Sequence, residues 1–422
     1  MSGDTRWGIV WFVTAAGILA AMQVGKVPPV IPQIGAELAV GPVTVGFVIS
    51  IFLAACAFLG PIGGVLGDRI GHRRYLIGGL ACVALASVAG GLAPDETTLL
   101  IARLVEGFGF LAVVVAAPSI IVAVSDRRDV RVALGIWGTY MPAGIALMMV
   151  LTPALIDSLG WRGIWFLNAG LLVPFLLFFA VTTKDTGGRP DHPGSLADVR
   201  IALSRPGPWL LAACFLVFAI QFLGMMAWLP SFFVEEAGFG SGLAAVTTAG
   251  IVVHNAVGNP IGGWLLRFVA RSALLGLTAA ALGVLAVLVF DVNTGIGLKI
   301  ALAALFSLVG GFIPAAVLTG APVFAPSPSQ IGATNGIIVQ GANFGSLIGP
   351  PAVAAVVAWA GGWSDARWFL FAMAAAGVVL ALALGGIERR LDRDELAHPT
   401  TDEPAPVKGL PGSRERSKAE RE

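Results

Sequence analysis

Twelve long apolar stretches alternate with short polar segments along this chain of 422 residues. A helix needs about 20 apolar residues to cross a bilayer, and the stretches are close to that length. Only helices and closed barrels satisfy every backbone hydrogen bond in lipid, and these stretches are too long and too evenly apolar for barrel strands. The pattern predicts an all-α integral membrane protein with twelve spanning helices. The predicted spans are residues 7–33, 43–66, 75–93, 98–123, 132–156, 162–182, 208–232, 243–266, 272–290, 296–321, 331–357 and 366–387.

The longest internal polar segment, residues 184–207, separates the first six spans from the last six. It contains three prolines, four glycines and charges of both signs, which is typical of a linker. The sequence therefore predicts a first six-helix half over residues 1–183, a cytoplasmic linker over 184–207 and a second six-helix half over 208–387. Residues 388–422 are rich in charged residues and cannot bury much apolar surface, so we predict a disordered cytoplasmic tail there.

The composition indicates the same class. Hydrophobic residues make up 57% of the chain and charged residues 12%, with a mean hydropathy of +0.87. Soluble domains carry about 25% charged residues. The net charge of +1 gives no indication of a nucleic-acid partner. Cys56, Cys82 and Cys214 lie in apolar stretches without metal or redox spacing, so we interpret them as small hydrophobic side chains.

The basic residues are distributed unevenly between the two sets of loops. Of the 26 Lys and Arg residues, 21 lie in the termini and the alternate loops that would share their side of the membrane. Cytoplasmic loops carry an excess of basic residues, so we predict that both termini are cytoplasmic. The first apolar stretch has no cleavage pattern after it and is expected to be a retained helix. We expect a plasma-membrane location, which in a bacterium is the inner membrane.

A short charged turn separates the second and third stretches. It reads Gly-Val-Leu-Gly-Asp-Arg-Ile-Gly-His-Arg-Arg over residues 64–74. Such a basic link is expected of a cytoplasmic turn, and its glycines allow a tight reversal and close helix approach. The turn resembles motif A of the major facilitator superfamily, which implies a gating element. The residues that match the motif are Gly64, Asp68, Arg69, Gly71, Arg73 and Arg74.

Two further segments are similar to the same superfamily. Residues 258–267, at the end of the eighth span, repeat the first part of the motif A turn, with Arg267 in the position of Asp68. Residues 103–109 look like motif B, with Glu106 where glutamine is frequent. The resemblance covers residues 6–388 and implies a twelve-helix fold of two halves that rock around a central site. It also implies that motif A and residues 127–131 hold the cytoplasmic side closed in one state.

Lys26 is the first of few ionisable residues within the predicted spans, where such residues are costly and become functional candidates. It lies three positions after Gln23 and is followed by Pro28, Pro29 and Pro32, which remove helix hydrogen bonds. We predict a broken helix at the transport pathway, where the Lys26 ammonium would bind an anionic group of the substrate. The alternative is that Lys26 extends to the membrane surface. Lysine beside consecutive prolines also resembles the cyanate and nitroimidazole transporter branch.

Arg103 and Glu106 are three positions apart and can share one helix face. A carboxylate in a dry site can carry a proton near neutral pH, so we predict a charge network for proton coupling. A structural role in packing the fourth span against the first is an equally open alternative. His254 is the third candidate for this network, because imidazole titrates near neutral pH. Its alternative is a packed, hydrogen-bonded histidine.

Three further residues are expected to line the substrate pathway with Lys26 and Gln23. They are Tyr140, Gln221 and Asn343. The fifth span carries Tyr-Met-Pro-Ala-Gly over residues 140–144 and lacks the Gly-Pro-x-x-Gly-Gly motif of the antiporter branches of the superfamily. That departure disfavours multidrug/proton antiport.

Enzyme signatures are missing from the sequence. We find no glycine-rich phosphate loop followed by Lys-Ser/Thr, no metal-ligand cluster and no credible Ser-His-Asp order, so we predict no enzyme activity, metal or cofactor. The predicted function is proton-coupled transport of a small organic or inorganic anion by a monomer embedded in membrane lipid. One alternative is proton-driven efflux of drug-like apolar or cationic compounds. Another is a non-transporting sensor or assembly factor on the same fold.

Overall fold

The computed structural model describes residues 4–126, 128–183, 196–325 and 330–397. Within these ranges the chain is almost entirely helical, and it contains no strand. Eleven helical stretches are long and apolar enough to cross a membrane. One of them, residues 132–182, makes two crossings, as shown below, so the prediction of twelve spanning helices is confirmed.

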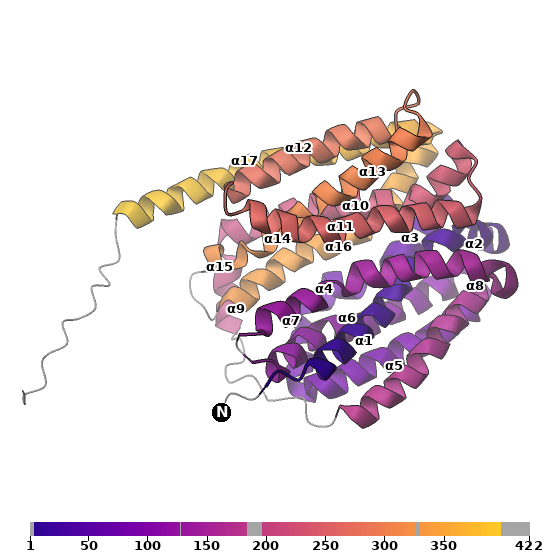
Figure 1. Ribbon diagram of the computed structural model, residues 1–422, viewed down its shortest axis with the longest axis horizontal. Coiled ribbons are helices and arrows are strands. Elements are labelled where there is room, and N and C mark those ends of the chain that lie inside the picture. Colours follow the sequence, from indigo (N-terminus) through magenta and orange to yellow (C-terminus); the bar gives the residue numbers. More distant parts are fainter. Residues whose placement is uncertain (1–3, 127, 184–195, 326–329, 398–422) are drawn as a thin grey trace, which may run out of the picture.

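The first half of the chain forms helices that run back and forth across the bundle (Figure 1). Two short 3-10 turns, η1 (Pro28–Val30) and η2 (Ile51–Leu53), interrupt the first two crossings. The helices are α1 (Trp7–Gly25), α2 (Ile31–Leu38), α3 (Pro42–Ser50), α4 (Ala54–Ile70), α5 (His72–Gly91), α6 (Glu96–Val124), α7 (Val130–Trp137) and α8 (Tyr140–Thr182).

The second half has the same character, with a further 3-10 turn, η4 (Trp363–Asp365), before the last helix. Its helices are α9 (Leu196–Leu203), α10 (Pro206–Ala237), α11 (Ser241–Leu265), α12 (Arg271–Val289), α13 (Ile296–Gly310), α14 (Phe312–Leu318), α15 (Ala321–Phe324), α16 (Ile331–Ala360) and α17 (Ala366–Ala397).

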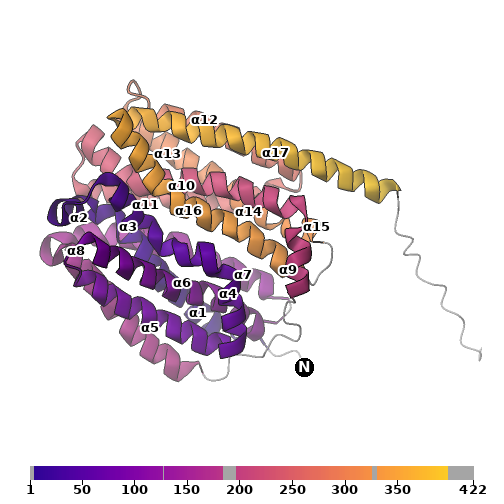
Figure 2. The same ribbon diagram turned by 180° about the vertical axis from the view of Figure 1, so that it is seen from behind.

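The described ends of the chain lie on the same side of the bundle, at the left of Figure 1. We call this side the terminal face and the opposite side the far face. Helices α1 to α8 gather in one group and α10 to α17 in another, as Figure 2 shows from behind. The two groups meet where α3 and α4 contact α16 and where α8 contacts α11. An apolar core fills each group, and one continuous part of it crosses the boundary between them.

Helix α8 contains a chain reversal at Gly160, where φ is 63° and ψ is 174°. The two ends of this region lie at the terminal face. Before it, Asp129 accepts a hydrogen bond from the Thr5 hydroxyl (2.5 Å), and at its end the Ala180 carbonyl accepts one from Arg73 (2.5 Å). The middle lies at the far face, where Arg162 pairs with Glu37. The predicted fifth and sixth spans are therefore two antiparallel helices joined at Gly160.

The first predicted span, residues 7–33, is broken as its prolines predict. Helix α1 ends at Gly25, Lys26 caps it, and the 3-10 turn η1 leads into α2. Proline at positions 28, 29 and 32 cannot donate the backbone hydrogen bonds that would continue a regular helix. The break leaves Lys26 at the point where the helix changes course.

Two predicted boundaries differ from the structure. Residues 196–203 of the predicted linker form α9, because Leu-Ala-Asp-Val-Arg-Ile-Ala-Leu contains good helix formers. Helix α17 continues to Ala397, ten residues into the predicted tail, and Glu388 at its extension pairs with Arg271 at 3.2 Å. This stretch lacks the Gly and Pro that would end a helix, and Pro399 follows it. The rest of the predicted tail, 398–422, lies outside the described residues, as do 184–195 of the linker.

A repeated contact joins the first and last helices of each half at the far face. In the first half the Trp161 indole donates to Glu37 (2.6 Å), and in the second half the Trp363 indole donates to Glu235 (2.8 Å). Glu37 and Glu235 are 198 positions apart in the sequence. The same spacing separates Gln23 from Gln221, so the two halves resemble each other in side-chain contacts as well as in helix order.

The repeat extends to the terminal face. Arg73 at the start of α5 donates to the Ala180 carbonyl and to the Thr183 hydroxyl (3.3 Å) at the end of α8. Arg271, 198 positions later, starts α12 and binds Glu388 near the end of α17. Arg73 of the motif A turn therefore binds the end of the sixth crossing in its own half, and its counterpart Arg271 binds the twelfth crossing.

The motif A turn connects α4 to α5 through Gly71, whose φ is 92°. The Asp68 carboxylate lies 3.3 Å from His72 Nε2, one helical turn on. The gating contacts expected between this turn and residues 127–131 stay a prediction, because Arg127 lies outside the described residues.

Gly71→Ala is expected to lower the free energy of unfolding by about 1–3 kcal/mol, because a side chain strains a backbone held at this positive φ. Nothing lies within 4 Å of an added Cβ at Gly71, so the loss reflects backbone strain alone. Gly64→Ala is the matched control, since Gly64 also has open space but lies within α4. Chemical unfolding in detergent measures both variants, and equal losses would contradict the assignment.

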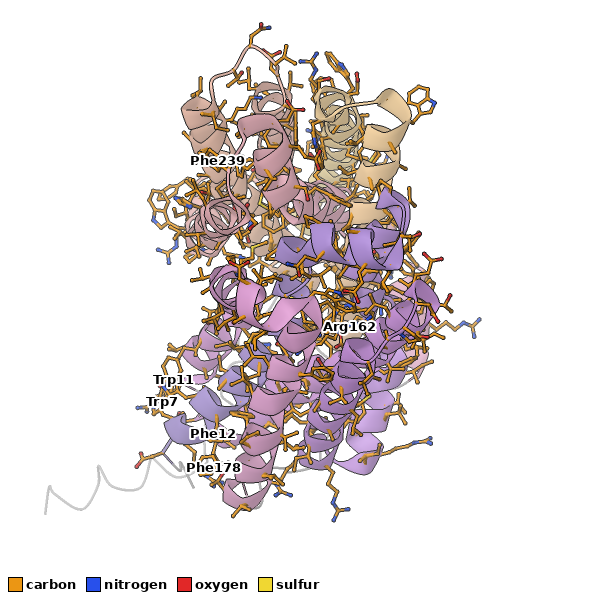
Figure 3. The ribbon with its side chains drawn as sticks, turned by 90° about the vertical axis from the view of Figure 1, so that its right-hand side faces the viewer. Trp7, Trp11, Phe12, Arg162, Phe178 and Phe239 are labelled. Carbon is orange, nitrogen blue, oxygen red and sulfur yellow. The ribbon has the colours of Figure 1, made fainter. Side chains whose placement is uncertain are left out.

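The side chains on the flanks of the bundle fit a lipid environment. Figure 3 looks along the helices from the far face and places Trp7, Trp11, Phe12 and Phe178 on one flank of the first half. Phe12 packs against Phe178 with ring centroids 5.1 Å apart, and Trp11 and Phe178 are exposed. Aromatic side chains of this kind favour the membrane interface and the lipid boundary.

Candidate functional site

Lys26 is buried at the break in the first crossing, and three side chains accept hydrogen bonds from its ammonium. Its ammonium lies 2.7 Å from Glu106 Oε1 and donates to Gln23 Oε1 (2.5 Å) and Ser87 Oγ (3.1 Å). All four side chains have an exposed fraction of 0%. An ammonium group has three protons, so each proton of Lys26 has one acceptor here.

Arg103 completes the charge cluster from the same side of α6 as Glu106. Its Nη1 donates to Glu106 Oε2 (2.5 Å) and to the Gln23 carbonyl (3.0 Å). Its Nε donates to the carbonyl of Val48 (2.9 Å), close to the point where α3 gives way to η2. The guanidinium also lies 4.8 Å from the ring centroid of Phe52. Arg103 and Glu106 are expected to meet because they are three positions apart on one helix, and the structure pairs them.

The sixth crossing contributes partners that the sequence did not reveal. Ser87 donates to the Trp165 carbonyl (3.0 Å), and the Lys26 ammonium lies 4.2 Å from the Trp165 ring. Asn168 Oδ1 accepts a hydrogen bond from Gln23 Nε2 (3.3 Å). The available signal was that Asn168 and Ser87 are polar residues inside apolar spans, where each needs a partner.

We call Lys26, Gln23, Ser87, Arg103, Glu106 and Asn168 the buried network. With its lysine, arginine and glutamate counted in their ordinary ionised forms, the network has a formal charge of +1. A buried charge is costly unless it is paired and hydrogen-bonded, and Glu106 supplies the only carboxylate among the members. Protonation of Glu106 would leave two cations unbalanced, so a proton taken up here changes how strongly α1 and α6 are held together.

A small cavity lies between the two halves, next to the buried network. It measures about 20 Å³, enough for one water molecule. Val24 and Pro28 on either side of Lys26 line it, as does Ile49, whose carbonyl accepts from Arg103 (3.4 Å). The remaining lining residues are also apolar: Ile145, Met149, Phe222, Leu223, Met226, Ala227 and Val252. The network therefore lies behind an apolar wall, and Lys26 is not among the residues that line the cavity.

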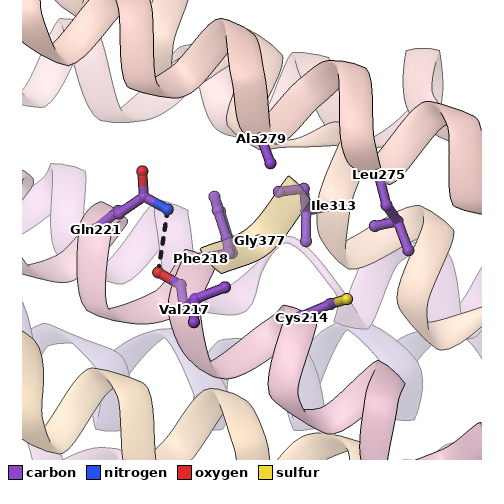
Figure 4. Close-up of a pocket in the computed structure, with 8 residues that line it drawn as sticks. All are labelled: Cys214, Val217, Phe218, Gln221, Leu275, Ala279, Ile313 and Gly377. Carbon is purple, nitrogen blue, oxygen red and sulfur yellow. Dashed lines mark hydrogen bonds between the residues drawn. The ribbon is translucent and has the colours of Figure 1, made fainter. Parts of the chain in front are cut away.

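Gln221 lies on the other side of α10 from this cavity. It lines a second cavity of about 10 Å³ inside the second half, with residues of α10, α12, α14 and α17 (Figure 4). Its amide nitrogen donates to the Val217 carbonyl at 3.2 Å, and its Oε1 has no hydrogen-bond partner among the described residues. The structure therefore does not bring Gln221 to Lys26.

The other predicted site residues also lie apart from the buried network. The Tyr140 ring stacks on Trp137 with centroids 4.2 Å apart. His254 is exposed, and its Nδ1 lies 2.8 Å from the Gly250 carbonyl one turn earlier. Asn343 is partly buried on α16. The structure thus unites Lys26, Gln23, Arg103 and Glu106 and separates them from Tyr140, Gln221, Asn343 and His254. In the part of the chain that the structure describes, no cluster of His, Cys, Asp or Glu could hold a metal ion.

Comparison with known proteins finds relatives that are named for different substrates. The chain is 28% identical over 348 residues to the probable nitrate/nitrite antiporter NarK1 of Thermus thermophilus, covering 74% of this chain and 77% of that protein. It is 30% identical over 301 residues to the 3-(3-hydroxy-phenyl)propionate transporter of Escherichia coli, covering 68% and 72%. It is 30% identical over 195 residues to the puromycin resistance protein pur8 of Streptomyces alboniger, covering 45% and 39%.

The chain spans between 37 and 59% of the length of three of the curated relatives it matches. Among solved structures, a bacterial homologue of the human lysosomal transporter Spinster in an inward-facing, unoccupied conformation superposes with a TM-score of 0.78. It is 16% identical, and the match covers 92% of this chain and 98% of that one. At this identity the likeness concerns the fold alone. The family model of the Major Facilitator Superfamily matches residues 13–327, and the chain belongs to this superfamily.

Proposed function

We propose that the protein is a proton-coupled transporter of a small organic anion with an apolar body, working by alternating access. The observation that supports this most directly is the position of the buried network. A formal charge of +1 lies behind the apolar wall of a cavity between the two halves.

Glu106 is the proposed proton carrier. It is the carboxylate shared by Lys26 and Arg103, at 2.7 and 2.5 Å, and it is completely buried. A proton on Glu106 weakens both ion pairs at once and so loosens the contact of α6 with Lys26, which caps α1. Because α1 lines the cavity through Val24 and is broken beside it, this loosening changes the wall that a substrate contacts.

The nature of the cavity wall and of the network together favour the substrate class. The apolar lining suits an aromatic or aliphatic body, and a net positive charge close behind it favours a negatively charged group. Proteins similar to this chain include a transporter named for 3-(3-hydroxy-phenyl)propionate. That compound has an aromatic body and a negatively charged carboxylate. The present cavity holds only about one water molecule, so the substrate enters after the halves separate.

Proton-driven efflux of apolar drug-like compounds is the second candidate. Its supporting observation is that all ten residues lining the cavity are apolar, which leaves no charged side chain in direct reach of a substrate. The similar puromycin resistance protein belongs with this alternative. For either function we propose that the chain lies in a bacterial inner membrane with both termini cytoplasmic, because the basic residues concentrate toward the terminal face.

The test uses purified protein in liposomes with an imposed pH gradient. The panel consists of 3-(3-hydroxyphenyl)propionate, nitrate and puromycin, measured with and without a protonophore. We expect gradient-dependent accumulation of the aromatic carboxylate, with little nitrate and little puromycin transport. Puromycin transport without the carboxylate would promote the efflux alternative, and nitrate transport without the carboxylate would overturn the apolar-body assignment.

Lys26→Met in the same assay tests the charge. It removes the ammonium from a site that holds one and leaves Glu106 balanced by Arg103 alone. We expect the variant to fold, because methionine fills the same volume and leaves no unpaired charge. We expect it to lose accumulation of the carboxylate, because the ammonium is gone. Undiminished accumulation would show that Lys26 is not required for an anionic substrate.

A further inference from the structure

We infer that Asn168 is a positioning residue that sets the direction of the Gln23 amide and thereby keeps an acceptor on Lys26. This role rests on the proposed function of the buried network. The residue lies on the sixth crossing, outside the charge cluster itself, and among the described residues it makes no hydrogen bond to a charged group of the network.

The argument begins with the two ends of a glutamine amide. One end is an oxygen that accepts hydrogen bonds, and the other is an NH₂ group that donates them. Only the oxygen can face the Lys26 ammonium, and in the structure Gln23 Oε1 lies 2.5 Å from it. An amide turned by 180° would aim two donors at a cation inside an enclosed site.

Asn168 determines which way the Gln23 amide turns. Its Oδ1 accepts from Gln23 Nε2 at 3.3 Å, which holds the Gln23 oxygen toward Lys26. The direction of Asn168 is fixed in turn, because its Nδ2 donates to the Ile164 carbonyl at 2.8 Å. A backbone carbonyl cannot change from acceptor to donor. The Ile164 carbonyl therefore fixes the orientation of the Asn168 amide, and the Asn168 amide fixes that of Gln23.

Asn168 also contacts the fifth crossing, which contributes residues to the wall of the cavity. Asn168 Nδ2 is 3.8 Å from the sulfur of Met148, and the adjacent Met149 lines the cavity between the halves. Ile145, another lining residue, packs so tightly on α1 that a Cβ at Gly25 would lie 2.7 Å from its Cα. The part of α8 that lines the cavity therefore contacts both α1 and Asn168, and Asn168 in turn contacts Gln23.

A ligand-free experiment tests the inference. Trp165 lies under the Lys26 ammonium, so its fluorescence reports on that cation. The chain has 11 tryptophans, and each variant is therefore measured with and without Trp165→Phe to isolate the emission of Trp165. Lys26→Met gives the emission without the cation. We expect Asn168→Leu to move the emission at least half of the way from wild type to Lys26→Met.

Gln23→Glu provides the rescue. A carboxylate has two acceptor oxygens, so it offers one to Lys26 whichever way it turns. In the Gln23→Glu background, Asn168→Leu should leave the Trp165 emission unchanged. Asn255→Leu is the matched control, because Asn255 is also a helix asparagine that donates to a carbonyl, that of Ser307 at 3.1 Å, and it lies on α11, outside the buried network. It should leave the emission of Trp165 at the wild-type value.

Three results would overturn the inference. The first is wild-type emission in Asn168→Leu while Lys26→Met changes it. The second is a change in Asn168→Leu that persists in the Gln23→Glu background, which would indicate a packing role alone. The third is no change even in Lys26→Met, which would contradict the contact between Lys26 and Trp165.

Transport of the aromatic carboxylate separates this inference from the proposed function. If Asn168 positions the proton site, Asn168→Leu should lose gradient-driven accumulation but keep exchange of labelled for unlabelled substrate, as Glu106→Gln should. Loss in Glu106→Gln with full accumulation in Asn168→Leu would overturn the role of Asn168 alone. Full accumulation in Glu106→Gln would overturn the proposed function, and the fluorescence result would still decide the role of Asn168.

Discussion

Arg103→Met is expected to lower the free energy of unfolding by about 3–5 kcal/mol, the usual loss when one partner of a buried ion pair is removed. The guanidinium is completely buried and binds Glu106 together with the carbonyls of Gln23, Val48 and Ile49. Methionine fills the space but donates to none of them. Unfolding in detergent, followed by circular dichroism or by thiol labelling of the buried Cys56, measures the loss.

Arg162→Met is the matched control for this loss. Arg162 also pairs with a glutamate, Glu37 at 2.9 Å, and also lies over an aromatic ring, that of Trp161. Its pair is about one-third to one-half exposed at the far face, where water replaces lost hydrogen bonds. We expect a loss of about 1–2 kcal/mol or less for this variant. Similar losses at the two arginines would show that the buried network contributes no special stability.

Glu106→Gln is expected to reduce proton-driven accumulation of substrate to the level of protein-free liposomes while exchange of labelled for unlabelled substrate persists. Glutamine has the shape of a protonated glutamate but cannot release a proton. The transporter would therefore keep the substrate site and the motion of the halves and lose the link to the pH gradient. The measurement compares accumulation under a pH gradient with exchange at equal pH in the same proteoliposomes.

Glu37→Gln is the control for that substitution. It makes the same chemical change in a carboxylate that also binds two side chains, Trp161 and Arg162, but at the far face and away from Lys26. Accumulation should survive it. If both variants lost accumulation and exchange alike, Glu106 would be a structural residue and another group would carry the proton.

The fold could be predicted from the sequence because the bilayer imposes a strong and simple rule on apolar length. Even so, helix ends depended on local chemistry. Gly160 allows the chain to turn back without a loop, and α17 continues through residues whose charge had suggested disorder. The break after Gly25 was predictable because three prolines follow within seven residues. In each case the deciding factor was backbone hydrogen bonding, which hydropathy does not measure.

The candidate site was only partly predictable. Arg103 and Glu106 could be paired because helical spacing relates them within one helix. The contact between Lys26 and Glu106 joins residues 80 positions apart, and the contact of Gln23 with Asn168 joins residues 145 apart. Nothing in a single sequence indicates which faces of these helices meet. For the same reason Gln221 was expected at the pathway, although it points into its own half.

The uneven charge of the two halves has an electrical consequence. The buried network carries a formal +1 in the first half, while the described residues that line the cavity of the equivalent glutamine in the second half, Gln221, include no cation. A charge inside the hydrocarbon senses the membrane potential, which is worth about 2.3 kcal/mol for one elementary charge moved through a full 100 mV. As the first half tilts, the network and any proton on Glu106 move through part of this voltage. If the network drives transport as proposed, we expect membrane voltage, as well as the pH difference, to bias which side of the membrane the transporter faces.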